Sequence, residues 1–442
     1  TSYAYRDIDA EHTTTQVSSL TNTFGGNTLS HSYTYDANGN ILSDGTTTYA
    51  YDSLNQLVWE YNTAAGKAWN YAYDLGGNIL SKTEYDYADG QTTNPVTVSY
   101  TYGDAAWRDL LTAYNGEAIT YDGIGNPTNY RGWGMTWQGG RQLASMQKDG
   151  TTLSFSYNDA GLRTEKTVNG ATRRYIWNSS QLMADVGAAD AFYFHYSSGG
   201  ELIGYTYKTA DAETECILVK NQQGDVERVI SADGTILAAY TYDAWGNVLT
   251  AEGILAQQNP IRYRSYYFDT ETSLYYLQSR YYDPAIGRFI NADGYVTTGQ
   301  KTLSYNMFAY CENKPVSLVD EDGYLAFPGE IHNLVVAYLS GKYNWLSEQR
   351  IDYKDSVLWG RADLISEEGE VWEVKRDRLR HIAKGLLQVK NYVENTWHNR
   401  PEVMLSLGYE IDEGQLPPYR RGATTSYITY RYYSNGLILY DY

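Results

Sequence analysis

The chain has 442 residues, a length at which more than one domain is expected, and it contains 47 Tyr and 40 Gly but only 8 Phe and 9 Pro. Its two cysteines are too few for a disulfide scaffold or a cysteine-based zinc site, and no run of 18 apolar residues is present to span a membrane. The formal net charge of −19 is uneven, because residues 325–442 hold 14 basic and 16 acidic side chains whereas residues 1–324 hold 20 and 37. Such an acidic first part disfavours nucleic acid as its partner.

Short units of the form Tyr-x-Tyr-Asp-x-x-Gly-Asn recur along residues 1–258. In each unit alternating aromatic residues precede an Asp/Gly/Asn turn and an aliphatic pair follows, which predicts strand, tight turn and strand. A single hairpin cannot bury its own apolar face, so the units must stack or curl into a shell. Tyr rings would pack across strands, and Asp and Asn side chains would cap the turns. The clearest copies begin at Tyr33, Tyr71 and Tyr240, and looser copies cover residues 49–57, 119–126 and 155–163.

These units resemble the YD repeats of Rhs and teneurin-like proteins, and the resemblance is strongest over residues 259–323. This stretch resembles the Rhs-associated core that joins a repeat shell to a variable C-terminal toxin. The resemblance implies a secreted or cell-surface bacterial protein whose toxin acts in the cytoplasm of a target cell. Because the chain opens at Thr1 without Met or a signal peptide, we interpret it as a piece of a longer protein. The matching segments are Asn259-Pro260-Ile261-Arg262-Tyr263-Arg264, Tyr275 to Phe289, Asn306-Met307-Phe308-Ala309-Tyr310 and Asn313 to Gly323.

Rhs cores often cut their own chain with two aspartates after an Asp-Pro-x-Gly-Leu motif. By this resemblance Asp293 and Asp320 are the candidate carboxylates, Arg288 is their candidate partner, and the scissile bond follows Tyr324. Paired carboxylates that share a proton carry out acid–base proteolysis. Both matching stretches lack the family's Pro and Tyr324 replaces its Leu, so simple turn-forming Asp-Gly segments are the alternative.

The pattern changes from residue 325 onward. Helical spacing of apolar residues predicts helices over 330–340 and 379–397, with strand-like segments at 356–366, 370–375, 402–409, 425–433 and 437–440. Residues i and i+2 of a strand share a face, so Glu373 and Lys375 would project together, and a hairpin around 366–369 would bring Asp363 beside them. Two carboxylates and one ammonium suit a hard divalent cation and an activated water.

This Asp-x9-Glu-x-Lys arrangement resembles the PD-(D/E)xK core of restriction-endonuclease-like nucleases, although Ala362 replaces the usual Pro. The resemblance implies that Asp363, Glu373 and the Val374 carbonyl ligate Mg²⁺ or Mn²⁺, and that Lys375 orients the attacking water. Glu330 is a candidate auxiliary acidic residue of this site, and Gln388, one helical turn from Tyr392, is a candidate for orienting Lys375 or contacting phosphate. The alternative for Glu330 is a carboxylate at a helix N-terminus, and the alternative for Gln388 is a position on an ordinary solvated helix face.

We therefore expect a β-rich YD-repeat shell of curled antiparallel sheet over 1–258, an Rhs-associated junction over 259–324, and a small α/β restriction-endonuclease-like domain over 325–442. The expected function is a polymorphic toxin whose nuclease cuts DNA in preference to tRNA and is restrained by a cognate immunity protein. One alternative is a non-enzymatic adhesion or carbohydrate-binding YD-repeat protein. Another alternative is a toxin of different chemistry. His332, His381 and His398 could serve a histidine-based ribonuclease, but no two of them have a spacing typical of such a site.

Overall fold

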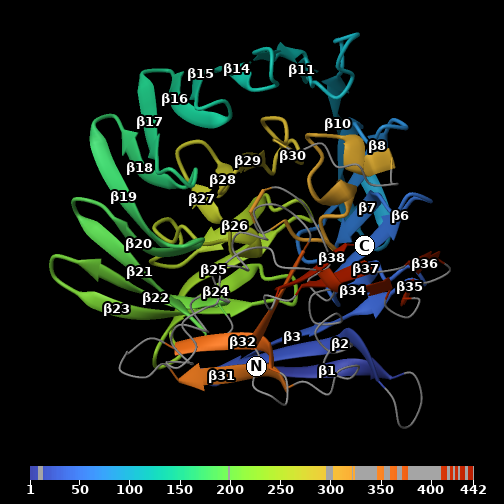
Figure 1. The fold of residues 1–442 in the computed structure, drawn as a ribbon. Helices are drawn as coiled ribbons and strands as arrows, with labels where there is room; N and C mark the ends of the chain where they lie inside the picture. Colours follow the sequence, from blue (N-terminus) through green and yellow to red (C-terminus); the bar gives the residue numbers. More distant parts are fainter. Residues whose placement is uncertain are drawn as a thin grey trace. The chain divides into compact units, whose positions relative to one another are not determined.

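The computed structural model describes residues 1–7, 13–197, 200–294, 302–320 and 322–323, and beyond them eight strands between residues 346 and 441. Contacts divide the chain into two units. The first comprises residues 1–36, 40–196 and 202–327, and the second comprises 37–39, 197–201 and 328–442. Throughout the described residues the regular structure is strand with three short 3-10 turns and no α-helix (Figure 1). The predicted β-rich architecture is confirmed for the part before residue 324.

Antiparallel strands in chain order build the first unit, and within each sheet every strand pairs with its neighbours in sequence. A three-stranded sheet contains β1 (Ser2–Asp7), β2 (Thr13–Phe24) and β3 (Asn27–Ser32). A nine-stranded sheet contains β4 (Thr34–Tyr35), β5 (Ile41–Ser43), β6 (Thr47–Tyr51), β7 (Leu57–Asn62), β8 (Lys67–Tyr73), β9 (Ile79–Ala88), β10 (Gln91–Thr101), β11 (Ala113–Tyr114) and β12 (Glu117–Ala118).

A fourteen-stranded sheet follows, with the same neighbour-to-neighbour pairing (Figure 1). Its strands are β13 (Thr120–Tyr121), β14 (Pro127–Tyr130), β15 (Trp133–Gln138), β16 (Gln142–Lys148), β17 (Thr151–Tyr157), β18 (Arg163–Val168), β19 (Ala171–Asn178), β20 (Gln181–Val186), β21 (Asp190–Tyr196), β22 (Leu202–Thr209), β23 (Glu213–Lys220), β24 (Val226–Ser231), β25 (Ile236–Tyr242) and β26 (Val248–Glu252).

The turns of the repeated units share one hydrogen-bonding pattern. In the turn between β25 and β26, the Asn247 backbone N–H donates to Asp243 Oδ1 at 2.9 Å and its side-chain amide donates to Oδ2 at 2.7 Å. Gly246 adopts a φ of 90° between them, in the left-handed region that favours glycine. The same two bonds recur in the turns of Asp36, Asp52, Asp74 and Asp122, so the predicted capping of turns by Asp and Asn is confirmed.

The last aromatic residue of each unit forms a hydrogen bond with the preceding unit. Its hydroxyl or indole N–H donates to the backbone carbonyl of the residue that directly follows the previous unit's turn, at 2.6–2.9 Å. A half-buried Tyr or Trp thus satisfies its polar atom while its ring packs against the core. The donor–acceptor pairs are Tyr51–Ile41, Tyr73–Leu57, Tyr102–Ile79, Trp137–Pro127, Trp177–Arg163 and Tyr242–Val226.

Most of the described residues between 259 and 320 are buried. Here lie a 3-10 turn η1 (Tyr263–Ser265), a four-stranded sheet of β27 (Tyr267–Asp269), β28 (Leu274–Leu277), β29 (Arg280–Asp283) and β30 (Arg288–Phe289), and the turns η2 (Thr302–Tyr305) and η3 (Cys311–Asn313). All residues of β28, β29 and β30 are buried. Side chains from the larger sheets reach this segment, as when Asp269 meets Arg163 of β18 at 2.6 Å. It therefore shares one core with the repeats.

The strands described in the second unit include a six-stranded sheet in the order β31-β32-β33-β38-β37-β34, in which β33 and β38 run parallel. Its members are β31 (Leu346–Asp352), β32 (Trp359–Ile365), β33 (Val371–Arg376), β34 (Glu410–Gln415), β37 (Thr429–Tyr433) and β38 (Leu437–Asp441). A separate pair contains β35 (Tyr419–Arg421) and β36 (Thr424–Ser426). The helices predicted over 330–340 and 379–397 lie outside the described residues, so the α/β class of this part stays a prediction.

Candidate functional site

Arg280, the first residue of β29, is the centre of a buried polar cluster near the end of the first unit. Its side chain is 5% exposed, and its guanidinium carbon lies 3.5 Å from the centroid of the Phe289 ring. One nitrogen, Nη2, lies 3.2 Å from Asp293 Oδ2 and also 3.2 Å from Asp320 Oδ2. Nη1 donates to the Met307 carbonyl at 3.1 Å. One arginine thus holds together the two aspartates predicted for self-cleavage.

The chain that leads to the predicted scissile bond enters the same cluster. The Gly323 N–H donates to Asp320 Oδ1 at 2.9 Å, and Arg280 Nε donates to the Gly323 carbonyl. The Ser279 hydroxyl donates to the Asp322 carbonyl at 2.6 Å. These contacts fix the backbone up to residue 323. Tyr324 itself lies outside the described residues.

Burial changes the acid–base behaviour of Asp320, which is 1% exposed. Burial raises the pKa of Asp320 to about 7, with smaller contributions from the negative charges of Asp322 and Asp293, while Arg280 acts in the opposite direction. A carboxyl group with this pKa holds its proton for much of the time at neutral pH. The pair of aspartates therefore offers one group that can give a proton and one that can take a proton.

Arg288, predicted as the partner of these aspartates, lies elsewhere. Its Nη1 donates to Asn78 Oδ1 at 3.0 Å and its Nη2 to the Asp109 carbonyl at 2.7 Å. It therefore links β30 to the turn after β8, and the structure does not bring it to Asp293 or Asp320. Sequence reasoning missed Arg280, although a signal was present: an arginine inside an apolar, tyrosine-rich strand must find an acidic partner when it is buried.

The candidate nuclease residues lie on neighbouring strands of the second unit. Asp363 belongs to β32, and Glu373, Val374 and Lys375 belong to β33. These strands pair antiparallel, with Leu364 opposite Trp372 and Ile365 opposite Val371. The backbone thus forms the hairpin that the sequence analysis expected, and the metal-binding and catalytic roles of these residues stay predictions. Glu330, Gln388, Tyr392 and the three C-terminal histidines lie outside the described residues.

The described part of the chain offers no group of three His, Cys, Asp or Glu side chains placed to hold a metal ion. No helix among the described residues is long and apolar enough to cross a membrane.

Comparison with known proteins supports the fold seen here. The Teneurin YD-shell family matches residues 191–316. The tRNA3(Ser)-specific nuclease WapA of Bacillus spizizenii is 34% identical over 222 residues, which cover 48% of this chain and 9% of the relative. The double-stranded DNA deaminase toxin A of Burkholderia cenocepacia is 27% identical over 345 residues, covering 68% of this chain and 22% of that protein. The chain thus spans about a tenth to a fifth of the length of these relatives.

A solved structure shares the architecture. The crystal structure of TcdB2-TccC3-Cdc42 matches with a TM-score of 0.58 and 20% identity, covering 73% of this chain and 18% of that one. At this identity the likeness concerns the fold. The matched family, the repeated turns and the aromatic hydrogen bonds together describe a YD-repeat, Rhs-like shell before residue 324, similar in sequence to part of WapA and in fold to part of TcdB2-TccC3.

Proposed function

We propose that this chain is part of a secreted polymorphic toxin, whose shell carries an effector and cuts the chain after Tyr324 to release residues 325–442. The observation that supports the cut is the meeting of Asp293, Asp320 and the Gly323 backbone at Arg280. The relatives that share the shell are named as toxins or nucleases, which supports the role of carrier.

The proposed cleavage is hydrolysis by a pair of carboxyl groups. Asp293, as carboxylate, would take a proton from a water molecule whose oxygen attacks the carbonyl carbon of Tyr324. Asp320, which holds a proton because of its raised pKa, would give it to the carbonyl oxygen. Collapse of the tetrahedral intermediate breaks the C–N bond. The proton taken by Asp293 passes to the amine of Leu325, and one hydroxyl of the intermediate returns a proton to Asp320 as the new carboxyl group forms. Arg280 would orient both carboxyl groups.

Self-cleavage is tested by purifying the chain and following it by mass spectrometry. The wild type should yield residues 325–442 as a separate fragment, whereas Asp293→Asn and Asp320→Asn should stay intact. Asp185→Asn is the matched control, because Asp185 is another buried, ion-paired aspartate, 1% exposed and 2.7 Å from Arg173. If Asp320→Asn is cut as fast as the wild type, the proposed centre is refuted. If Asp185→Asn also stays intact, general misfolding explains the loss.

We further propose that the released residues 325–442 are a metal-dependent nuclease. The adjacency of β32 and β33 favours this, since it puts Asp363 on the strand beside Glu373 and Lys375. Asp363, Glu373 and the Val374 carbonyl would hold Mg²⁺ or Mn²⁺, ions that prefer oxygen ligands and stabilise charge on a phosphodiester. Lys375 would orient the attacking water. The sequence favoured DNA as substrate, while the name of the WapA relative favours tRNA.

The nuclease proposal is tested by incubating the chain, after any self-cleavage, with plasmid DNA and separately with total tRNA, in Mg²⁺ and in EDTA. Magnesium-dependent degradation of one substrate, lost in Glu373→Gln and Lys375→Ala, is the expected result. Degradation that survives both substitutions would rule out these residues. An immunity protein encoded by the producing cell should bind residues 325–442 and suppress the activity. A folded chain that degrades neither substrate would favour a binding protein or another toxin chemistry.

A further inference from the structure

A lysine and an aspartate from distant strands meet inside the first unit. Lys82 Nζ, from β9, lies 3.1 Å from Oδ2 of Asp243, in the turn between β25 and β26, although 161 residues separate the two in sequence. The side chain of Lys82 is 15% exposed and that of Asp243 is 2% exposed. This ion pair joins the nine-stranded sheet to the last hairpin of the fourteen-stranded sheet.

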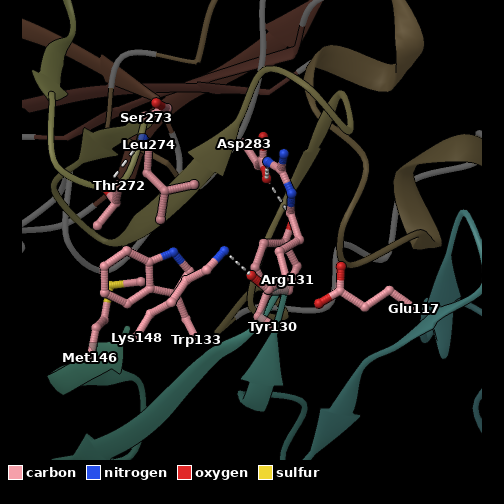
Figure 2. A pocket seen from close by; sticks show the side chains of 10 residues that line it. All are labelled: Glu117, Tyr130, Arg131, Trp133, Met146, Lys148, Thr272, Ser273, Leu274 and Asp283. Atoms are coloured by element: carbon pink, nitrogen blue, oxygen red, sulfur yellow. Dashed lines mark hydrogen bonds and ion pairs between the residues drawn. The ribbon is translucent and has the colours of Figure 1, made fainter. Parts of the chain in front are cut away.

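Other buried aspartates of the first unit pair with arginine. Figure 2 shows one such pair beside a pocket, in which the buried Asp283 accepts from Arg131 Nη1 at 2.8 Å. A guanidinium keeps its proton at every physiological pH, so it cannot act as a nucleophile. A lysine amine can do so once it has lost its proton. The pair of Lys82 and Asp243 therefore has a chemistry that the arginine pairs lack.

A third titratable group, Glu60 of β7, lies against the same turn. Glu60 is 1% exposed, and both of its carboxyl oxygens accept from the Ala244 N–H, next to Asp243, at 3.0 Å. Burial raises the pKa of Glu60 well above its ordinary value, and the negative charge of Asp243 adds to this, while the Ala244 N–H and Lys82 act in the opposite direction. A protonated carboxyl group at this place can give one proton and take another.

The two carboxyl oxygens of Asp243 have different surroundings. Oδ1 accepts from the backbone N–H groups of Trp245 at 3.0 Å and of Asn247 at 2.9 Å. Two fixed N–H groups stabilise the negative charge that develops on an oxygen when a nucleophile attacks its carbon. Oδ2 instead faces Lys82 Nζ and accepts from the Asn247 side-chain amide at 2.7 Å. Oδ1 is thus placed to remain in a reaction with Lys82, and Oδ2 is placed to leave.

Aromatic rings surround the lysine. Its Nζ lies 5.8 Å from the centroid of the Trp69 ring and 5.9 Å from that of Tyr71, and both of these residues are buried. Burial favours the neutral amine and lowers the pKa of Lys82, but Asp243 and Glu60 outweigh it and raise the pKa above its ordinary value. The neutral pair of amine and carboxylic acid is therefore a minor state, and any reaction that starts from it is slow.

We propose that Lys82 and Asp243 form a covalent isopeptide bond, and that Glu60 moves the protons. The ion pair first becomes neutral when Nζ gives a proton to Oδ2. The amine then attacks Cγ, and Glu60 takes a proton from the nitrogen with one oxygen while its other oxygen gives a proton to Oδ2. The Cγ–Oδ2 bond breaks, Oδ2 leaves as water, and an amide joins Nζ to Cγ. Glu60 regains its proton, so no further reactant is needed.

A second buried lysine serves as an internal control. Lys166 Nζ lies 2.8 Å from Asp269 Oδ1, but Arg163 binds both oxygens of this carboxylate, at 2.6 and 3.0 Å. Although burial acts in the other direction, Arg163 and Lys166 hold the pKa of Asp269 below its usual value. An ionised carboxylate resists attack by an amine, so we expect no bond between Lys166 and Asp269.

The bond is tested by measuring the mass of the purified, denatured chain and by mapping its peptides. The mass should be lower than that of the sequence by one water molecule, and a protease digest should contain a branched peptide that joins Lys82 to Asp243. If the chain has cut itself after Tyr324, the fragment that ends there should carry the same loss. The bond is independent of the proposed cleavage and nuclease activities, because none of its residues belongs to either centre.

Three variants separate the roles of the residues. Glu60→Gln keeps an acceptor for a backbone N–H but has no acidic proton, so it should lack the branched peptide. Lys82→Arg keeps the positive charge without forming the amide. It should have the full mass of its sequence and a lower midpoint of thermal unfolding, because a covalent bond across a long loop restricts the unfolded chain. Lys67→Arg, a partly exposed lysine of β8 paired with Glu84, is the matched control and should retain the bond.

Three results would overturn the proposal: a wild-type chain that has its full mass after days at neutral pH, a water loss without the branched peptide, or a branched peptide that Glu60→Gln retains at the wild-type level. The second result would assign the loss to a cyclic imide at an Asp-Gly pair such as Asp149-Gly150. If Glu60→Gln fails to fold, the peptide map of the wild type decides alone whether the bond exists.

Discussion

At the scale of single residues, the first unit contains buried charges that are paired with opposite charges. Arg163, 1% exposed, contacts Asp269 through Nη1 at 2.6 Å and Nη2 at 3.0 Å, and Lys166 adds a third bond at 2.8 Å. Burial alone would raise the pKa of Asp269, but Arg163 and Lys166 outweigh it and hold that pKa below its usual value. Rings of Tyr175, Tyr276 and other aromatic residues surround the guanidinium. Because Asp269 is far along the chain, this pair joins the repeats to the segment 259–320.

Replacing Arg163 by Met should destabilise the shell strongly. The substitution keeps an apolar stem but leaves Asp269 buried with only Lys166 to balance it, a situation that costs about 3 to 5 kcal/mol. Chemical denaturation followed by near-ultraviolet circular dichroism gives the change in free energy of unfolding. Arg174→Met is the control, since Arg174 pairs with Glu165 on the surface with its side chain 75% exposed, and it should change stability by less than about 1 kcal/mol. Equal effects of the two substitutions would contradict this account.

At the scale of elements, the repeated turn was predictable because its determinants are local. An Asp, a Gly and an Asn within five residues contain both the hydrogen bonds and the left-handed backbone that the turn needs. What surrounds each turn was not predictable. In the turn between β25 and β26, a Cβ on Gly246 would lie 2.5 Å from the ring of Tyr263, a residue of the segment 259–320. A Cβ on Gly170, whose φ is 88°, would instead lie in open space.

These two glycines separate the cost of backbone conformation from the cost of packing. Gly170→Ala should lose about 1 to 2 kcal/mol, the penalty of the left-handed region for a residue with a Cβ. Gly246→Ala should lose that amount plus about 1 to 3 kcal/mol from overpacking against Tyr263. Thermal unfolding of both variants beside the wild type measures the difference. Indistinguishable midpoints would show that the Tyr263 ring moves aside without cost.

The candidate sites show the same division between local and distant information. The strands that carry Asp363 and Glu373 could be predicted, because alternation and a short polar turn specify a hairpin within about a dozen residues. Asp293 and Asp320 could be named by resemblance alone. The sequence prediction of Arg288 as their partner was wrong, because Arg280 lies in the same tyrosine-rich stretch and the tertiary fold decides which arginine meets the aspartates.

At the scale of the whole first unit, the N-terminal strands pack beside strands that follow much later in the chain. His31 of β3 lies 2.8 Å from Glu227 of β24, and the Asn22 amide donates to the Lys220 carbonyl at 3.0 Å. Residue separations across this contact are 196 and 198. We call this contact the seam.

The seam should weaken as the pH rises. Burial alone would lower the pKa of His31, but the hydrogen bond to Glu227 and the charges of Glu227, Asp44 and Asp225 raise it above its ordinary value. The charged pair therefore contributes fully below about pH 6.5, the ordinary histidine pKa, and its contribution is lost as the pH rises through the raised value. Hydrogen exchange of β3 amides at pH 5.5 and pH 8.5 should show faster exchange, after correction for intrinsic rates, at the higher pH.

His31→Gln supplies the control for this dependence. The variant keeps a hydrogen-bonding side chain but cannot be protonated, so the corrected exchange of β3 should be the same at both pH values. A variant that retains the wild-type pH dependence would show that another group titrates at the seam.

The seam has a consequence for synthesis. The ribosome must add nearly two hundred residues after His31 before Glu227 exists, which takes roughly 10 to 40 s at usual translation rates. During that interval the face of β2 and β3 that will be covered by β23 and β24 has no partner from its own chain. A nascent chain stalled before residue 220 should therefore bind chaperones through these strands, and one released beyond residue 260 should not.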